Sequence, residues 1–323
     1  MQIPEFVTAL VAEDLKAVDE RIRARLASDV PLIQQVARHI SAGGGKRLRP
    51  ILVLLAAGAT GYQGCLHHEF AAVVEIIHTA TLLHDDVVDA SDLRRGRQTA
   101  NVVFGNAASV LVGDFLHSRS FQMMVAAGNP AAMRILADAT SLIAEGEVLQ
   151  LAHCHDSKVD EERYLQVIRY KTAKLFEAAA RLGAVLGGGG DTLESALGRY
   201  GGHLGTAFQI VDDVLDFSGE ETEVGKRLGD DLAEGKPTLP LIYVLRHGTP
   251  EQEAVVRQAI EQGGRALFPE VLAAVRASGA LLHAQRLAER QIESAREVIG
   301  VLPDTKYKEA LLEFALFAVQ RTY

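Results

Sequence analysis

The chain has 323 residues, a formal net charge of −9, 48% hydrophobic residues and two cysteines. This length and apolar content allow a large core without disulfides, and the acidic balance argues against nucleic acid as the main partner. Cys65 and Cys154 are too few for a disulfide framework, so a reducing, cytoplasmic location is expected. The longest uncharged stretch, residues 50–68, is interrupted by three glycines, so no transmembrane segment is predicted and a soluble protein is expected.

Apolar residues recur at helical spacing along almost the whole chain, and strand-like alternation is nearly absent. Ala and Leu are abundant and Trp is absent, a composition that suits helices packed closely on helices. Gly and Pro clusters divide the pattern into roughly a dozen helices. Because no linker or internal repeat interrupts it, the sequence predicts an all-α, single-domain bundle over residues 1–323.

Residues 43–50, GGGKRLRP, place three glycines and three cations ahead of a long apolar helix. Glycine lets the backbone approach an anion closely, and helix N-termini favour negative charge. The segment is not a P-loop, because Arg47 stands where that motif has Ser or Thr. A plain surface loop is an equally common reading of this segment taken alone.

Two motifs, HDDVVD and VDDVLD, place aspartates inside apolar helical patterns. Asp85 and Asp89 are four residues apart and share one face of a helix, and Asp212 and Asp216 do the same. Like charges at this spacing repel, so a compensating partner is required. Hard oxygen ligands suit Mg²⁺, and bound metal explains how an acidic protein holds an anionic substrate. Either motif alone could be a solvated helix face. The presence of two such motifs, each within a similar apolar helical pattern, favours metal binding.

Further cations are interleaved with the two aspartate motifs, as expected where two diphosphates bind side by side. They are Arg94 and Arg95 after the first motif, Lys171 in KTAK, and Lys226 and Lys236 after the second.

Three other clusters are set aside. Glu75 and His78 form half of a di-iron unit whose second half the chain lacks, so Glu75 is expected to be structural. Residues 153–155, HCH, point in divergent directions if consecutive on a helix and are not expected to share a zinc ion. His67 and His68 follow a glycine-containing turn and are predicted to be surface residues rather than ligands.

Seven segments occur in the order of a known family: GGGKRLRP, HTATLLHDDVVDASDLRRG, NAASVLVGDF, AEGEVLQL, KTAKLFEAAA, LGTAFQIVDDVLDF and GDDLAEGKPTLP. Over essentially its whole length the chain resembles the trans-type polyprenyl diphosphate synthases, and among them the bacterial octaprenyl diphosphate synthases of quinone side-chain assembly. The resemblance implies a helical bundle around a deep central cavity, a homodimer, and condensation of isopentenyl diphosphate with an allylic diphosphate such as farnesyl diphosphate.

The resemblance also implies a role for each site residue. About three Mg²⁺ ions would be ligated by Asp85, Asp89 and Asp212, with Asp86, Asp213 and Asp216 supporting them as catalytic residues. Isopentenyl diphosphate would contact Gly45, Lys46, Arg49, His78 and Arg95. The allylic diphosphate would contact Arg94, Lys171, Thr172, Gln209, Lys226 and Lys236.

The implied mechanism is ionisation of the allylic diphosphate, attack on the carbocation by the double bond of isopentenyl diphosphate, and proton loss. No nucleophilic side chain is needed, in agreement with the lack of a Ser-His or Cys-His pair near the motifs. A terpene cyclase is disfavoured, since it has no use for a second diphosphate site. A non-catalytic subunit of a heteromeric synthase is disfavoured because the chain keeps all six aspartates.

Product length is expected to depend on the helix that carries the first motif. Ala80 and Thr81 lie about one turn before Asp85 and are both small, so a long product, octaprenyl diphosphate, is expected. The resemblance favours Ala80 as the gate, whereas ideal helix geometry favours Thr81. Met123 is either a core residue or part of the cavity floor. A nonaprenyl or shorter product stays open as the alternative.

Overall fold

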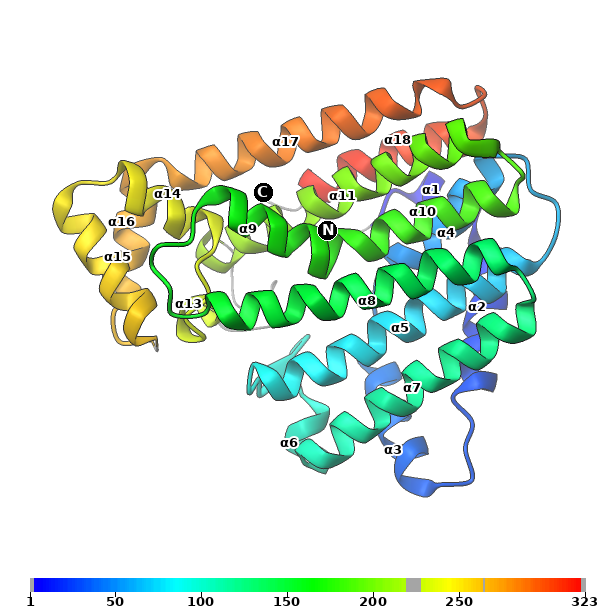
Figure 1. Cartoon of the computed structure of the whole chain (residues 1–323), viewed down its shortest axis with the longest axis horizontal. Helices are drawn as coiled ribbons and strands as arrows, with labels where there is room; N and C mark the ends of the chain where they lie inside the picture. Colours follow the sequence, from blue (N-terminus) through cyan, green and yellow to red (C-terminus); the bar gives the residue numbers. More distant parts are fainter. Residues whose placement is uncertain (1–2, 219–227, 264, 321–323) are drawn as a thin grey trace. The chain divides into compact units, whose positions relative to one another are not determined.

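The computed structural model describes residues 3–218, 228–263 and 265–320. These residues are almost entirely α-helical, with one short two-stranded hairpin (Figure 1). The all-α prediction is confirmed. The described residues hold more α-helices than the dozen expected, because the pattern is also broken into short pieces: α1 (Glu5–Leu10), α6 (Ala100–Phe104) and α13 (Asp230–Ala233).

The chain packs into two compact units, each built from segments far apart in the sequence. The first comprises Met1–Thr140, Leu175–Gly201 and Val298–Phe314, and the second comprises Ser141–Lys174, Gly202–Glu297 and Ala315–Tyr323. Several residues of each of three helices fall in both units: α8 (Pro130–His153), α11 (Gly190–Ser218) and α18 (Lys306–Val319). The single domain expected from the sequence stays a prediction.

The first unit is centred on apolar helices that bury nearly every residue. In α4 all positions from Pro50 to Ala57 are buried, which explains its uninterrupted apolar sequence. Gly183 allows α10 to approach α4 closely, because a Cβ there would lie 2.4 Å from Ala56 Cβ. The long helices of this unit, including these two, are α2 (Ala12–Arg25), α3 (Pro31–Ala42), α4 (Leu48–Ala59), α5 (Leu66–Val88), α7 (Asn106–Ala127) and α10 (Lys174–Leu186).

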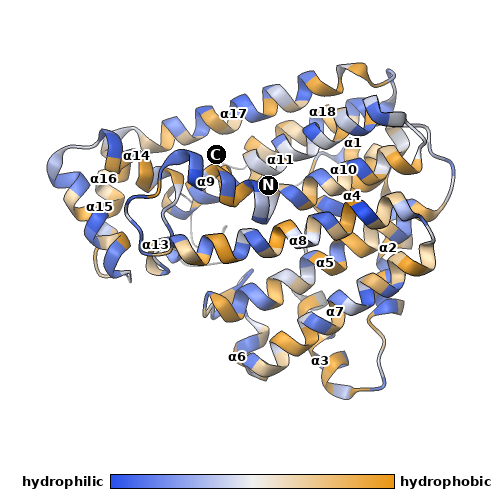
Figure 2. Cartoon of the chain, viewed as in Figure 1, coloured by the Kyte–Doolittle hydropathy of each residue, from blue (hydrophilic) through white to orange (hydrophobic). Residues whose placement is uncertain are grey.

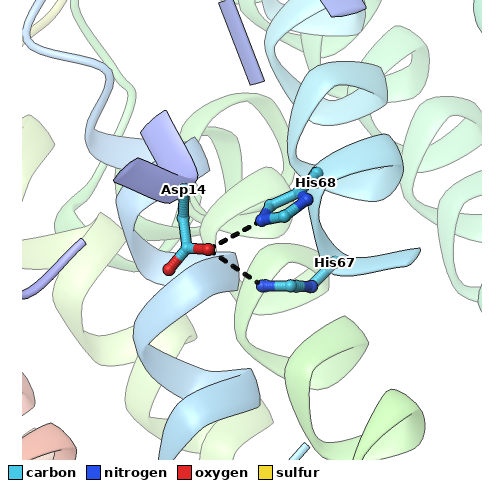
Figure 3. Close-up of side chains that lie close together, drawn as sticks. All are labelled: Asp14, His67 and His68. Carbon is cyan, nitrogen blue, oxygen red and sulfur yellow. Dashed lines mark hydrogen bonds and ion pairs between the residues drawn. The ribbon is translucent and has the colours of Figure 1, made fainter. Parts of the chain in front are cut away.

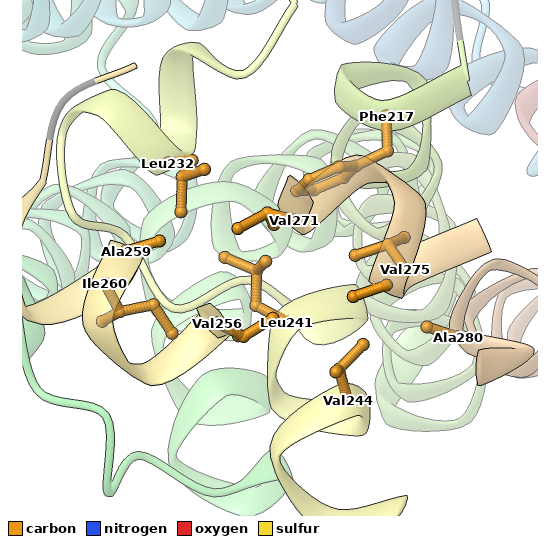
Figure 4. Packing of buried hydrophobic residues seen from close by; sticks show 11 residues of the cluster. Phe217, Leu232, Leu241, Val244, Val256, Ala259, Ile260, Val271, Val275 and Ala280 are labelled. Carbon is orange, nitrogen blue, oxygen red and sulfur yellow. The ribbon is translucent and has the colours of Figure 1, made fainter. Parts of the chain in front are cut away.

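The second unit has a separate hydrophobic cluster around Phe217, Leu241 and Val271 (Figure 4). Thr249 and Gln252 form a capping box that begins α15, with Pro250 at its first position. Hydrophilic and hydrophobic residues alternate along α17, as Figure 2 shows, which is typical of a helix with one covered face. The helices of this unit include α9 (Glu161–Ile168), a π-helix (Arg169–Ala173), α14 (Leu239–His247), α15 (Pro250–Gln262), α16 (Phe268–Ser278) and α17 (Ala280–Val298).

Within the described ranges, no helix combines the length and apolar character needed to cross a bilayer.

Candidate active site

The end of α5 carries the first aspartate motif. Asp85 and Asp89 are half-buried, whereas Asp86 is buried and accepts a 2.8 Å hydrogen bond from Arg94 Nε. Asn101 adds a 3.0 Å hydrogen bond to the Asp86 carbonyl oxygen. Asp86 is therefore fixed by its neighbours, and the two half-buried carboxylates at positions 85 and 89 are more accessible to a ligand.

The pKa of Asp86 reflects electrostatic repulsion among the carboxylates of this motif. Burial raises the pKa of its carboxyl, the Arg94 guanidinium opposes the rise, and the charges of Asp85 and Asp89 add to it. Asp85 and Asp89 thus lie close enough to disfavour the ionisation of Asp86. A bound cation would relieve this repulsion.

A hairpin directly after α5 positions the next two arginines. Strands β1 (Leu93–Arg94) and β2 (Arg97–Gln98) pair in antiparallel fashion around a turn in which Arg95 has φ of 54° and Gly96 has φ of 72°. This turn aims Arg95 Nη1 at the carbonyl oxygen of Gly44. A Cβ at Gly45 would lie 2.9 Å from the same guanidinium, so the glycine-rich loop and Arg95 meet only because the loop has no side chain there.

His78 lies on α5 in a strongly positive environment. Burial lowers the pKa of its imidazole well below the usual value, and the charges of Arg49, Arg95, Arg94 and Arg47 lower it further. The ring is therefore neutral at physiological pH and acts as a hydrogen-bonding group rather than a cation. Arg49 and Arg95 are the two of these arginines that the sequence analysis places with His78 at one diphosphate.

The guanidinium of Arg49 stacks over the ring of Phe176, with Cζ 4.3 Å from the ring centroid. This stacking holds the planar cation in place at modest cost in side-chain entropy. Arg49 is half-buried, so its charge faces a restricted environment rather than open solvent.

Arg47 has a different function from its neighbours in GGGKRLRP. Its Nη1 donates a 2.6 Å hydrogen bond to Glu75 Oε1, and its Nη2 lies 3.2 Å from Asp19 Oδ1. Arg47 also has φ of 51° and precedes the first residue of α4. The buried Glu75 thus anchors the start of α4 to α5, in accordance with the structural role expected for it.

The end of α11 carries the second aspartate motif with a similar division. Asp212 is half-buried, whereas Asp213 is buried between two donors. Tyr164 Oη donates to Asp213 Oδ2 at 2.6 Å, and Gln209 Nε2 donates to Oδ1 at 2.8 Å. Gln209 in turn accepts a 2.9 Å hydrogen bond from Thr172 Oγ1. The motif is thereby linked to α9 and the π-helix.

The third aspartate of this motif also has a partner in the protein, and its predicted catalytic role stays a prediction. Asp216 is fully buried and accepts a 3.1 Å hydrogen bond from the Gly229 backbone N–H through Oδ1. It therefore fixes the start of the segment that leads to Lys236, whose Nζ lies 2.5 Å from Glu234 Oε2. Lys226 lies outside the described residues.

The π-helix places Lys171 beside two polar residues of α8. Lys171 Nζ contacts a carboxylate oxygen of Glu147 and donates a 2.8 Å hydrogen bond to Gln150 Oε1. Gly146 permits this packing, since a Cβ there would lie 2.6 Å from the Lys171 backbone nitrogen. Glu147 and Gln150 hold the ammonium group in a defined position.

The proposed chain-length residues differ in exposure. Ala80 and Met123 are fully buried, on α5 and α7, which pack against each other within the first unit. Thr81 is half-buried, and its hydroxyl donates a 2.9 Å hydrogen bond to the His78 carbonyl oxygen. Their effect on product length stays a prediction.

Sequence reasoning missed several partners of the site. Tyr164, Glu147 and Asp231 were not assigned roles, yet Tyr164 clamps Asp213, and the charge of Asp231 perturbs it. Glu147 and Asp231 do occur in the segments AEGEVLQL and GDDLAEGKPTLP, whose family order was a usable signal. Tyr164 had none, because its segment reads only as an amphipathic helix.

Comparisons with known proteins show which family the chain resembles over most of its length. The model of the polyprenyl synthetase family matches residues 30–275. The octaprenyl diphosphate synthase of Escherichia coli is 51% identical over 98% of this chain and 98% of its own length. An all-trans-nonaprenyl-diphosphate synthase (geranyl-diphosphate specific) of Rhodobacter capsulatus is 44% identical over 98% and 97%.

A solved structure shows the same fold. The polyprenyl synthase of Caulobacter crescentus, crystallised with calcium and isoprenyl diphosphate, matches with a TM-score of 0.96 and 43% identity over 99% of this chain and 98% of that one. The chain belongs to the polyprenyl synthetase family. As a member of this family, it is a prenyltransferase with the all-α isoprenoid synthase fold.

Proposed function

We propose that the protein adds isopentenyl diphosphate units to an allylic diphosphate such as farnesyl diphosphate and releases octaprenyl diphosphate, the precursor of a quinone side chain. The 51% identity to an octaprenyl diphosphate synthase supports this product. The 44% identity to a nonaprenyl-diphosphate synthase makes a nine-unit product the nearest alternative. A cytoplasmic location is proposed because two cysteines, Cys65 and Cys154, are too few for a disulfide framework.

One observation carries the proposal. In each aspartate motif the middle carboxylate is buried and held by donors, Arg94 for Asp86 and Tyr164 for Asp213, while the first carboxylate is half-buried. Asp85 and Asp212 are thus supported by a rigid neighbour and more accessible to a ligand. This is the arrangement expected of ligands that share a cation with a substrate phosphate.

The donor set fits Mg²⁺. Asp85, Asp89 and Asp212 offer carboxylate oxygens, which hard divalent cations prefer, and the mutual repulsion around Asp86 favours a cation there. The Caulobacter crescentus relative, crystallised with calcium, supports an oxygen-ligated divalent ion. When bound, Mg²⁺ would stabilise the negative charge that develops on the departing diphosphate.

The protein's own residues provide binding, orientation and charge. We assign Lys46, Arg49, His78 and Arg95, together with the Gly45 backbone, to isopentenyl diphosphate. The short Arg95–Gly44 contact and the Arg49–Phe176 stacking orient two of these cations before substrate arrives. Because His78 is neutral, it can donate one hydrogen bond to a phosphate oxygen without acting as an acid.

The allylic diphosphate is assigned to Arg94, Lys171, Thr172, Gln209, Lys226 and Lys236. Lys171 and Gln209 are already held by Glu147 and Thr172, so they bind with little loss of side-chain entropy. The positive charge of these side chains stabilises the leaving diphosphate, to which bound Mg²⁺ would add, and the double bond of isopentenyl diphosphate then attacks the allylic carbocation. The departed diphosphate is the base that takes the final proton.

The deciding experiment incubates the purified protein with farnesyl diphosphate, radiolabelled isopentenyl diphosphate and Mg²⁺, and then sizes the extracted product. The synthase produces labelled octaprenyl diphosphate. A cyclase leaves the label unincorporated and releases a hydrocarbon, and a non-catalytic subunit gives no product until its partner is added. Either of the latter outcomes overturns the proposal.

We also propose a homodimer. On α7, Leu111 and Val125 are 66% and 64% exposed, and Phe121 lies within about 80° of both around the helix axis. Val125→Glu together with Leu111→Glu is expected to shift the sedimenting species from dimer to monomer, because two charges would be buried in the interface. Leu282→Glu on α17, also exposed, is the matched control and is expected to leave the dimer intact. A monomeric unmodified protein would contradict the proposal.

A further inference from the structure

Asp14, His67 and His68 lie close together in the first unit (Figure 3). His68 Nε2 lies 2.7 Å from Asp14 Oδ1, and His67 Nε2 lies 3.5 Å from the same oxygen. Among the residues that the structure describes, this is the one group of three potential metal ligands whose donor atoms all lie within 4.8 Å of one another. Two imidazoles and one carboxylate are thus directed at a common point.

The two histidines are not the surface residues expected from the sequence. Their side chains are only 13% and 15% exposed, and Asp14 is 33% exposed. Consecutive helical side chains normally diverge by about 100°. Here both occur in the first turn of α5, where their rings lie 4.0 Å apart at an interplanar angle of 34°. This convergence allows neighbouring residues to serve one ligand.

The chemistry of the three side chains suits a divalent cation. Burial and the neighbouring charge of His68 lower the pKa of His67, whereas the Asp14 carboxylate raises it. Neutral imidazole is the form that coordinates metal, and the Asp14 carboxylate supplies the negative charge that compensates a divalent cation.

We propose that Asp14, His67 and His68 bind a divalent transition metal ion, for which Zn²⁺ is the preferred candidate. Imidazole nitrogen together with carboxylate oxygen suits zinc, nickel or copper, whereas Mg²⁺ prefers oxygen ligands alone. In tetrahedral coordination the donor atoms would lie about 3.4 Å apart, with a fourth position left for water. The 3.5 Å separation of His67 and Asp14 is close to this value, whereas the 2.7 Å contact of His68 with Asp14 would have to lengthen.

The proposed site is independent of the prenyltransferase site. His67 and Asp85 are 18 residues apart on the same helix, which corresponds to about 27 Å. Bound metal would join the start of α5 to the first turn of α2, where Asp14 lies. Arg21 and Arg25 of α2 already pair with Glu69 of α5 just beyond the histidines, so the metal would extend an existing contact between these two helices.

The expected affinity for metal depends on the ring nitrogen of each histidine that does not face Asp14. His67 Nδ1 and His68 Nδ1 are buried with no hydrogen-bond partner among the described residues. Metal-binding histidines usually donate this N–H to a carbonyl or carboxylate, and loss of such a partner weakens binding by about 10- to 100-fold. We therefore expect micromolar rather than structural-zinc affinity.

The test uses full-length, tag-free protein stripped of metal and dialysed against micromolar Zn²⁺ in excess Mg²⁺, which saturates the oxygen-rich motifs. Metal analysis is expected to show one more zinc per chain in the unmodified protein than in the His67→Gln/His68→Gln variant. His247→Gln, at an exposed histidine of α14, is the control and is expected to retain that zinc. At a hundredfold excess of free zinc over the Kd, the midpoint of thermal unfolding should rise by about 4 °C in the unmodified protein and in the His247→Gln control, but not in the double variant.

Equal zinc content, or an equal thermal shift, in the unmodified protein and the double variant would overturn the proposal and leave a purely structural hydrogen-bonded cluster. If the double variant does not fold, Asp14→Asn replaces it, because an amide removes the charge while keeping the shape. This variant is expected to weaken zinc binding by at least tenfold, and unchanged binding would refute the site. Prenyl transfer in Mg²⁺ alone is expected to be unchanged in each variant.

Discussion

Tyr164 donates a 2.6 Å hydrogen bond to Asp213, 49 residues further along the chain. Burial and the nearby charge of Asp231 raise the pKa of Asp213 to about 7, and the hydrogen bonds from Tyr164 and Gln209 oppose the rise. The middle carboxylate of the second motif is therefore poised between its charged and neutral forms, and Tyr164 favours the charged form.

Tyr164→Phe should destabilise the metal-free protein more at pH 8 than at pH 5. The folded-state pKa of Asp213 lies above its ordinary value, so the stability contributed by the bound proton is present at low pH and lost as the pH rises through about 7. Without the hydrogen bond from Tyr164, the charged form of the buried Asp213 carboxylate has a higher free energy. We expect a loss of about 1.5–3 kcal/mol at pH 8 and about 0.5–1.5 kcal/mol at pH 5, measured by urea unfolding in EDTA.

Tyr200→Phe is the matched control for this measurement. Its hydroxyl is equally buried and donates a 2.6 Å hydrogen bond to the carbonyl oxygen of Leu311, which does not titrate. The control should therefore lose a similar free energy of unfolding at both pH values. If the Tyr164 variant shows the same pH-independent loss, Asp213 does not titrate in this range.

Much of the fold and the centre of the site were predictable from the sequence because they depend on periodic patterns. Helical spacing of apolar residues predicted the all-α class, and a pair of aspartates four residues apart inside such a pattern marked the ends of α5 and α11. Glu75 was recognised as structural because the second half of a di-iron site was missing. These inferences needed only local sequence.

Partners that depend on tertiary structure were not predictable. Arg47 stands among phosphate-binding cations in the sequence, yet it pairs with Glu75, 28 residues away. His67 and His68 follow a turn and read as surface residues, but packing of α2 against α5 places them beside Asp14. Such pairings are set by which helices pack together, and hydrophobic spacing does not specify that choice.

Asp85→Ala and Asp212→Ala should each reduce turnover by orders of magnitude while leaving the fold intact. Both residues are half-buried, so their removal leaves no large cavity, and the loss would come from missing charge stabilisation in the transition state. Steady-state rates at saturating Mg²⁺ and circular dichroism provide the measurements. Asp138→Ala, at an exposed position of α8, is the control and should be fully active. Near-normal Mg²⁺-dependent activity of Asp85→Ala would contradict the proposal that Asp85 binds the catalytic metal.

Arg49→Ala should raise the KM for isopentenyl diphosphate, and Lys226→Ala should act mainly on the allylic substrate. A charge-assisted contact with a phosphate contributes about 2–3 kcal/mol, so each KM should rise by tens- to a hundredfold. Arg49→Lys keeps the charge but loses the planar fork that stacks on Phe176, and it should show an intermediate effect. Identical changes in both KM values for both alanine variants would contradict the assignment.

Product length should depend on Ala80 and Thr81, which lie one helical turn before the first motif. The growing chain is expected to run along α5, so a large ring about 5–8 Å below the carboxylates should meet it after about three or four units. Ala80→Tyr is the first variant to make, and because Ala80 is fully buried, its thermal unfolding must be checked for overpacking. Thr81→Phe is the second, at a half-buried position on the same face as Asp85. Chromatography of the radiolabelled products should show shorter chains with the first condensations retained. Full-length chains from both variants would mean that the tail does not pass this helix, and the small residues at these positions would then say nothing about product length.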